Sequence, residues 1–247
     1  MVEKLEDNRL NELSETIILD YLKFKNLKPE SVVCIDIEGL AKEYFGFEIR
    51  YESICEDDLG KVAFSANGIK PLKVHRNGKV QSVVFPADTI VMDRYFKRAE
   101  HYSSRRFNIG HEIGHKILSK VAPGHSQGNY MTIFDKEREY SFDELKEIMK
   151  ISETQANQMS AALQMPMFLL RNTIRRICKA ELFPVYGDYQ MLPDDSANLK
   201  RMADDLGVAP TTLLIRLRVC KLIEHHDIDE YFELINLRGS GENVCYC

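Results

Sequence analysis

Of all its sequence features, the five residues His111-Glu112-Ile113-Gly114-His115 place the strongest constraint on the fold and function of this 247-residue chain. If they are helical, the two histidines lie one turn apart on the same face, where both imidazoles can bind one metal ion. Glu112 comes next around the helix, where a carboxylate can act as a general base without being a metal ligand. The same pattern also arises by chance in helices whose histidines are surface or core residues. Alone, it leaves both interpretations open.

A second helix is marked at both ends by its sequence. Ser152 and Gln155 form a capping-box pattern and Pro166 ends the apolar run, which predicts a helix from about 152 to 164. The apolar stripe of this helix consists of Ala156, Met159 and Leu163.

Glu153 and Asn157 share another face of the predicted second helix. A carboxylate at this position could be the third protein ligand of a catalytic zinc site, with the fourth position left for water. The alternative is that Glu153 only interacts favourably with the positive end of the helix dipole.

Composition sets the wider limits. The length fits one large domain or a domain with an appendage. A net charge of -5 gives no basic excess that would indicate nucleic-acid binding. The N-terminus is charged and lacks a signal-peptide core, and no apolar run is long enough to span a membrane. We therefore expect a cytoplasmic protein.

The six cysteines are too widely scattered for a small disulfide scaffold, and reduced thiols are expected in the cytosol. Cys245-Tyr246-Cys247 is the exception, because this pair could bind a soft metal or form a redox pair. A frayed terminal tail is the other interpretation.

Two helices and a small sheet are predicted before the metal-site helix. Residues 9–25 have apolar residues at helical spacing, and Asp36 is an N-cap for a second helix that Gly46 ends. From Phe47 the period changes to two, and further strand candidates follow at 62–66, 80–85 and 89–92, with turns at Asn67-Gly68 and Asn77-Gly78. This predicts a small antiparallel sheet whose edge could pair with an extended peptide, or which only packs on the helix.

The central helix is expected to begin near Ser103 or Ser104 and to end before Pro123-Gly124. Gly110 and Gly114 each disfavour a helix by about 1 kcal/mol relative to alanine. Close approach of another backbone or of a substrate is the simplest reason for them.

After Pro166 another helix is expected over 168–181, followed by a turn-rich stretch that is the only credible boundary. Thr211 is expected to cap the second of two helices joined by a turn that contains Gly207, which is the spacing of a helix-turn-helix. The basic side chains there could face phosphates, and they are Arg216, Arg218 and Lys221. Nearby acidic side chains argue against a DNA surface, and they are Asp194, Asp195, Asp204 and Asp205. A role in packing or substrate docking is the alternative.

The two site helices together resemble the ImmA/IrrE-type metallopeptidase family. The matching residues are Arg106-Phe107 before His111 to His115, then Glu153, Ala156-Asn157 and Leu163-Gln164-Met165-Pro166. In element order the resemblance covers roughly 36–224, but its specific motifs occupy only these helices. Many members have Phe-Ala in place of Met159-Ser160, and the connection between the helices is long and charged here.

The resemblance implies an α+β fold. Its parts would be an N-terminal helical extension (1–35), a zincin-like domain with a small antiparallel sheet packed on the H-E-x-x-H helix (36–183), and a C-terminal helix-turn-helix-like segment (184–247). It also implies a gluzincin-like site in which His111, His115 and Glu153 hold zinc and Glu112 activates water. Zinc held by such ligands stays Lewis acidic and lowers the pKa of a bound water to about 7.

Other residues are expected to assist this chemistry. Asn157 is expected to orient a metal ligand through its amide. A Tyr, His or Arg usually assists the zinc in stabilising the oxyanion, and the sequence offers four candidates without choosing among them: Tyr102, Arg106, His125 and Tyr130. Residues 135–149 could form a lid helix over the site or a solvated surface helix.

The resulting prediction is a cytoplasmic zinc endopeptidase. The resemblance implies that its substrate is a regulatory protein, typically a helix-turn-helix repressor. The charge balance and the lack of a long apolar run predict no direct binding to nucleic acid or membrane. The alternative is a metal-binding regulator that acts by contact, and a third and weaker hypothesis is DNA binding through residues 197–223. Glu112 favours hydrolysis, because a pure binding module does not need a base.

Overall fold

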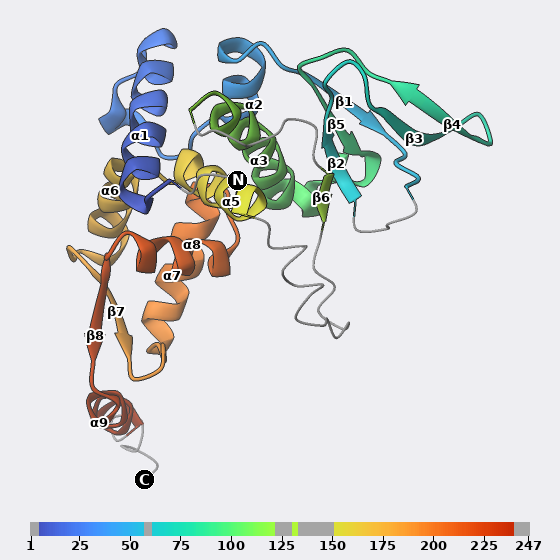
Figure 1. Cartoon of the computed structure of the whole chain (residues 1–247). Helices are drawn as coiled ribbons and strands as arrows, with labels where there is room; N and C mark the ends of the chain where they lie inside the picture. Colours follow the sequence, from blue (N-terminus) through green and yellow to red (C-terminus); the bar gives the residue numbers. More distant parts are fainter. Residues whose placement is uncertain (1–4, 57–60, 122–129, 133–150, 240–247) are drawn as a thin grey trace.

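The computed structural model describes residues 5–56, 61–121, 130–132 and 151–239 (Figure 1). The described part is α+β, as predicted. Its helices are α1 (Asp7–Phe24), η1 (Pro29–Ser31), α2 (Ile37–Gly39), η2 (Leu40–Tyr44), η3 (Arg94–Lys97), η4 (Ala99–His101), α3 (Tyr102–Val121), α5 (Ile151–Gln164), α6 (Met167–Cys178), α7 (Pro193–Leu206), α8 (Pro210–Val219) and α9 (Ile228–Gly239). Its strands are β1 (Glu48–Glu52), β2 (Lys61–Ser65), β3 (Pro71–Arg76), β4 (Lys79–Val84), β5 (Thr89–Asp93), β6 (Tyr130–Thr132), β7 (Phe183–Tyr186) and β8 (Ile223–His226).

The main sheet lies beside α3 and has the strand order β1-β5-β2-β6 (Figure 1). β2 pairs antiparallel with β5 and β6, but β1 pairs parallel with β5. The prediction of an antiparallel sheet is therefore wrong for one pair. The reason is the connectivity of the chain. β2 and the β3–β4 hairpin lie between β1 and β5 in the sequence, and the chain has reversed its direction twice by the time it enters β5, so β5 runs in the same direction as β1.

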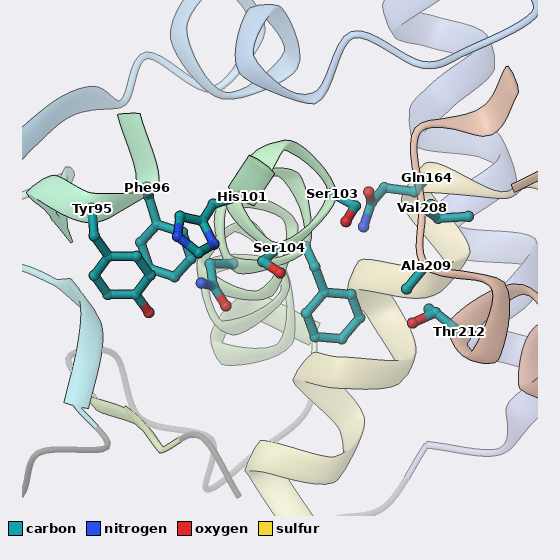
Figure 2. A pocket seen from close by; sticks show the side chains of 11 residues that line it. Tyr95, Phe96, His101, Ser103, Ser104, Gln164, Val208, Ala209 and Thr212 are labelled. Carbon is teal, nitrogen blue, oxygen red and sulfur yellow. The ribbon is translucent and has the colours of Figure 1, made fainter. Parts of the chain in front are cut away.

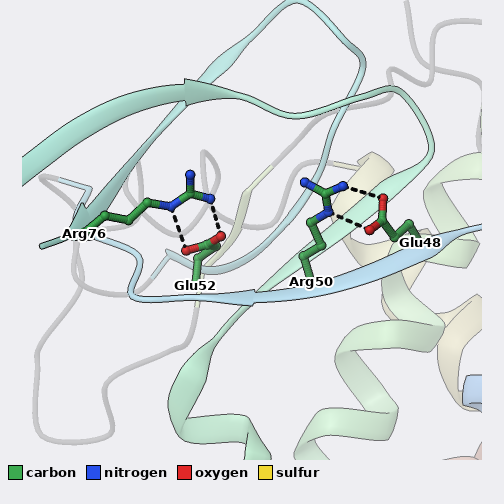
Figure 3. Close-up of polar contacts among 4 residues, drawn as sticks. All are labelled: Glu48, Arg50, Glu52 and Arg76. Atoms are coloured by element: carbon green, nitrogen blue, oxygen red, sulfur yellow. Dashed lines mark hydrogen bonds and ion pairs between the residues drawn. The ribbon is translucent and has the colours of Figure 1, made fainter.

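The β3–β4 hairpin forms a separate sheet that projects from the main one (Figure 1). Asn77 and Gly78 join its strands with φ angles of 51° and 76°, as the predicted turn requires. Arg76 at the end of β3 forms an ion pair with Glu52 of β1, and Arg50 pairs with Glu48 on the same strand (Figure 3). The Arg76–Glu52 pair ties the hairpin to the main sheet.

β5 is an interior strand of the main sheet and is buried on both faces. Ile90 and Met92 belong to the core shared with the helices, whereas Val91 belongs to a smaller cluster with the hairpin residues Leu72 and Val74. Alternation along a strand places these residues on opposite faces. The sheet therefore separates the helical body from the hairpin.

The N-terminal helices largely follow the sequence prediction. α1 buries the side chains of Leu10, Ile18 and Tyr21. The Oδ1 atom of Asp36 accepts a hydrogen bond of 2.9 Å from the backbone N–H of Gly39, which confirms the predicted N-cap. Gly46 has a φ of 74° after this helical segment, the left-handed conformation that a helix-ending glycine supplies.

The C-terminal helices pack into the same core as the site helices. Their buried apolar residues are Leu199, Met202, Ala203, Leu206, Leu213 and Leu217. The predicted cap at Thr211 is wrong, because α8 starts one residue earlier with Pro210 in its first turn. The turn-rich stretch contains β7, which pairs parallel with β8, and these strands with α9 extend from the body (Figure 1).

In the part of the chain that the structure describes, no helix is both long enough and apolar enough to cross a membrane. The described cysteines Cys34, Cys55, Cys178 and Cys220 are free thiols. Cys245 and Cys247 lie outside the described residues.

Candidate metal centre

The packing of α3 against α5 builds the site. A Cβ atom added to Gly114 would lie 3.0 Å from the carbonyl oxygen of Ala156, and one added to Gly110 would lie 2.6 Å from the Oγ of Ser160. The same hydroxyl donates a hydrogen bond of 2.7 Å to the carbonyl of Phe107. The two glycines therefore allow α5 to lie directly against α3, which confirms the predicted close approach of another backbone.

This contact brings three possible ligands together. The Nε2 atom of His111 lies 3.3 Å from one carboxylate oxygen of Glu153, and the Nε2 atom of His115 lies 3.5 Å from the other. The two Nε2 atoms are 2.9 Å apart, and the imidazole planes are nearly perpendicular at 84°. Both histidines are buried and Glu153 is half-buried.

Asn157 orients one of these imidazoles. It lies one turn after Glu153 on α5, and its Oδ1 atom is 2.8 Å from the Nδ1 atom of His111. An Nδ1–H that donates to this amide oxygen leaves the Nε2 lone pair of His111 directed at Glu153 and His115. This is the arrangement that the sequence predicted for Asn157.

Glu112 lies beside the three possible ligands and is completely buried. Neither of its carboxylate oxygens has a hydrogen-bond partner among the described residues. Burial raises the pKa of Glu112 to about 8, with His111 acting to lower it and Glu153 acting to raise it. A buried carboxyl without a hydrogen bond destabilises the fold, so packing alone does not account for this residue.

The pKa values of Glu153 and His111 shift in opposite directions. Burial by itself would raise the pKa of Glu153, but hydrogen bonds from His111 and His115 outweigh it and lower the pKa to about 2. Burial likewise would lower the pKa of His111, and the hydrogen bond to Glu153 together with the nearby carboxylates raises it. The carboxylate of Glu153 thus favours positive charge at the two imidazoles. That charge can be supplied by protons, or by a metal ion that displaces the protons.

The residues present fit a zinc ion. Their three ligand atoms all lie within 4.8 Å of one another, and they could hold a metal ion. A tetrahedral zinc with bonds of 2.0–2.1 Å separates its ligands by about 3.3 Å, which is close to the histidine–carboxylate distances. A cation at this position would also favour the ionised form of the adjacent Glu112.

Two of the four oxyanion candidates can be assessed from their side chains. The guanidinium of Arg106 is buried and donates hydrogen bonds of 3.1 and 3.3 Å to the carbonyls of Gly207 and Leu206. Two nitrogens of the Arg106 guanidinium are therefore engaged at the end of α7, which favours a structural role for this residue over stabilisation of an oxyanion. Tyr102 is 45% exposed, and its ring packs against the guanidinium groups of Arg105 and Arg106.

The other two candidates stay predictions. His125 and the predicted lid helix over 135–149 lie outside the described residues. Tyr130 lies in β6, which is the edge strand next to β2 among the described strands.

Arg216 does not face phosphates as the helix-turn-helix interpretation proposed. It is buried at 5% exposure, and its guanidinium donates to the carbonyl of Met165 at 3.2 Å and to Oδ1 of Asn11 at 2.6 Å. Arg218 is exposed and its guanidinium lies over the ring of Tyr189.

Comparison with known proteins adds no assignment. No protein-family model matches this chain, and a search of curated proteins finds no match.

Proposed function

We propose that this protein is a zinc-dependent endopeptidase in which His111, His115 and Glu153 hold the metal ion and Glu112 is the general base. The observation that carries the proposal is Glu112, which is completely buried and has no hydrogen-bond partner among the described residues. A protein that only binds a metal has no use for such a carboxyl. A hydrolase needs one beside its metal to accept a proton from water.

Each residue has a defined task in hydrolysis. Zinc, when bound, supplies Lewis acidity toward the peptide carbonyl and the attacking water. Glu112 accepts a proton from the water as the water oxygen bonds to the carbonyl carbon. Glu112 then gives that proton to the departing amine nitrogen as the C–N bond breaks. Asn157 keeps the ring of His111 in the required tautomer and orientation.

An endopeptidase must also hold its substrate in an extended form. The main sheet ends at β6, and among the described strands none pairs with its outer edge. An extended peptide can add to such an edge through main-chain hydrogen bonds. The neighbouring strand β2 contacts α3, so this edge belongs to the same part of the molecule as the metal ligands.

The resemblance to the ImmA/IrrE-type peptidases rests on the motif residues of α3 and α5. It suggests a regulatory protein as the substrate, in particular a helix-turn-helix repressor whose cleavage relieves repression. A metal-binding regulator that acts by contact is the second candidate, because the three possible ligands lie together whether or not a bond is cleaved.

Glu112→Gln separates the two candidates, because it keeps the size of the side chain and removes the base. We expect wild type and the variant to bind one zinc per chain, measured by elemental mass spectrometry. Only wild type should cleave a repressor encoded beside the gene, with a loss in the variant of about 100-fold or more. Equal relief of repression by a zinc-loaded Glu112→Gln protein would favour the contact regulator.

A further inference from the structure

A pocket of about 370 Å³ lies between the first half of α3, the segment before it and the start of α8 (Figure 2). Figure 2 shows Tyr95, Phe96 and His101 on one side and Val208, Ala209 and Thr212 on the other. The exposed surface of its walls is mostly apolar, and polar side chains contribute a smaller part of it. This composition and this size are typical of ligand-binding pockets.

The pocket reaches α3 at a point one helical turn before the candidate metal centre. Phe107 and Asn108 both line it, and they precede His111 and Glu112 by four residues each. Residues four apart lie on the same face of a helix, separated by about 6 Å along its axis. A group that contacts Phe107 or Asn108 is therefore about one helical turn along α3 from His111 and Glu112.

Gln164 supplies a buried hydrogen-bond acceptor. This residue lies at the end of α5, and in Figure 2 its amide points toward Ser103. Its Nε2 atom donates to the carbonyl and hydroxyl oxygens of Ser160 at 3.3 and 3.2 Å, which fixes the orientation of the amide. The Oε1 atom is buried without a hydrogen-bond partner among the described residues. A donor that enters the pocket could pair with this oxygen.

We propose that this pocket binds an aromatic substrate side chain that carries a hydrogen-bond donor, tyrosine or tryptophan, next to the cleaved bond. The proposal rests on the proposed peptidase function. The rings of Tyr95, Phe96 and Phe107 offer edge and face contacts to an aromatic ring. The hydroxyl of tyrosine or the indole N–H of tryptophan donates to Oε1 of Gln164. Phenylalanine leaves this oxygen unpaired and binds more weakly.

Cleavage of a peptide library by the zinc-loaded protein tests the preference. Wild type should cleave next to tyrosine or tryptophan at one position, at least tenfold faster than next to leucine or alanine. Thr212→Phe should fill the pocket and abolish this preference. Thr211→Phe, on an exposed residue outside the pocket, should retain it. An unchanged preference in Thr212→Phe would overturn the proposal.

Ser104→Trp fills the pocket from an exposed position on α3 and serves as the second variant in case Thr212→Phe does not fold. Gln164→Leu removes the acceptor and tests it separately. We expect the ratio of rates for tyrosine over phenylalanine to fall to about one, whereas a purely structural role for Gln164 would lower both rates equally and leave the ratio unchanged.

Binding without catalysis separates this inference from the proposed function. N-acetyl-L-tyrosinamide is titrated into zinc-loaded Glu112→Gln protein and followed by nuclear magnetic resonance. We expect saturable binding that is at least tenfold weaker in Thr212→Phe and unaltered in Thr211→Phe. Absence of saturable binding would overturn the pocket assignment alone. Binding without Glu112-dependent cleavage of any peptide would instead leave the pocket assigned and reject the peptidase.

Discussion

The α3–α5 and α7–α8 helix pairs both bury polar side chains but give them different surroundings. Arg216 on α8 is 5% exposed and hydrogen-bonds to Met165 and Asn11. Glu112 on α3 is completely buried, and its oxygens have no hydrogen-bond partner among the described residues. Because burial of an ionisable group is unfavourable without partners, the fold explains Arg216 and leaves Glu112 to be explained by chemistry.

Arg106 extends the comparison. It belongs to the motif that suggested a peptidase, yet its guanidinium donates hydrogen bonds to the carbonyls of Leu206 and Gly207. Arg106 therefore joins α3 to the end of α7, as Arg216 joins α8 to the end of α5. The C-terminal helices are fixed to both site helices, and they form one wall of the pocket beside the site.

Removal of a metal ligand should have the largest effect. We expect His115→Ala and Glu153→Ala to weaken zinc binding by more than the roughly 10- to 100-fold typical of residues that only support a ligand. Competition with a chromophoric chelator measures the affinity. Glu12→Ala, on the exposed side of α1, is the control and should bind zinc like wild type. Full zinc affinity in His115→Ala would reject the ligand assignment.

Asn157→Leu should have a smaller effect on the same equilibrium. It removes the acceptor of the 2.8 Å contact with Nδ1 of His111, so we expect an affinity loss of about 10- to 100-fold. Asn157→Asp keeps an acceptor oxygen and should bind zinc more tightly than Asn157→Leu. Equal affinities for wild type and Asn157→Leu would show that the amide does not orient the ligand.

Gly114→Ala tests the contact between the site helices. Alanine favours a helix by about 1 kcal/mol, but its Cβ atom would lie 3.0 Å from the backbone carbonyl oxygen of Ala156. We expect a net destabilisation of about 1–3 kcal/mol in urea unfolding.

Gly110→Ala tests the same helix contact at a position where a side chain, not the backbone, lies closest. Its Cβ atom would meet a side-chain atom, the Oγ of Ser160. Ser160→Ala should therefore relieve part of the destabilisation caused by Gly110→Ala and none of that caused by Gly114→Ala. A Gly114→Ala protein as stable as wild type would contradict the close packing.

Arg216→Met tests the hydrogen bonds that join α8 to the end of α5 and to α1. The loss of its hydrogen bonds should lower the free energy of unfolding by about 1–3 kcal/mol, with no change in zinc affinity. Arg218→Met is the matched control on the same helix, where loss of the contact with Tyr189 should cost about 1 kcal/mol or less. An Arg216→Met protein as stable as wild type would show that the hydrogen bonds of this arginine do not stabilise the fold.

The sequence predicted local features better than distant ones. The spacing of His111 and His115, the cap at Asp36 and the turn at Asn77-Gly78 depend on neighbouring residues, so short patterns determine them. The two glycines of α3 indicated close approach of another backbone or of a substrate, and the structure shows the backbone of α5 there. The same kind of pattern predicted the helix that carries Glu153.

Features that depend on distant residues were not predictable in this way. The parallel pairing of β1 with β5 and of β7 with β8 joins segments far apart in the sequence. The directions of Arg106 and Arg216 depend on carbonyl groups that helix packing places within reach. Some pocket residues share helical spacing on and before α3, but the others come from α5 and the start of α8, so no single local pattern could have identified the pocket.

X-ray absorption at the zinc K-edge tests the central claim most directly. For the protein loaded with one zinc per chain, we predict nitrogen and oxygen ligands at about 2.0–2.2 Å, with the scattering of two imidazoles and no sulfur. His111→Ala should lose one imidazole or the metal itself. Sulfur at about 2.3 Å would place the zinc on cysteine thiolates and contradict the assignment of His111, His115 and Glu153 as its ligands.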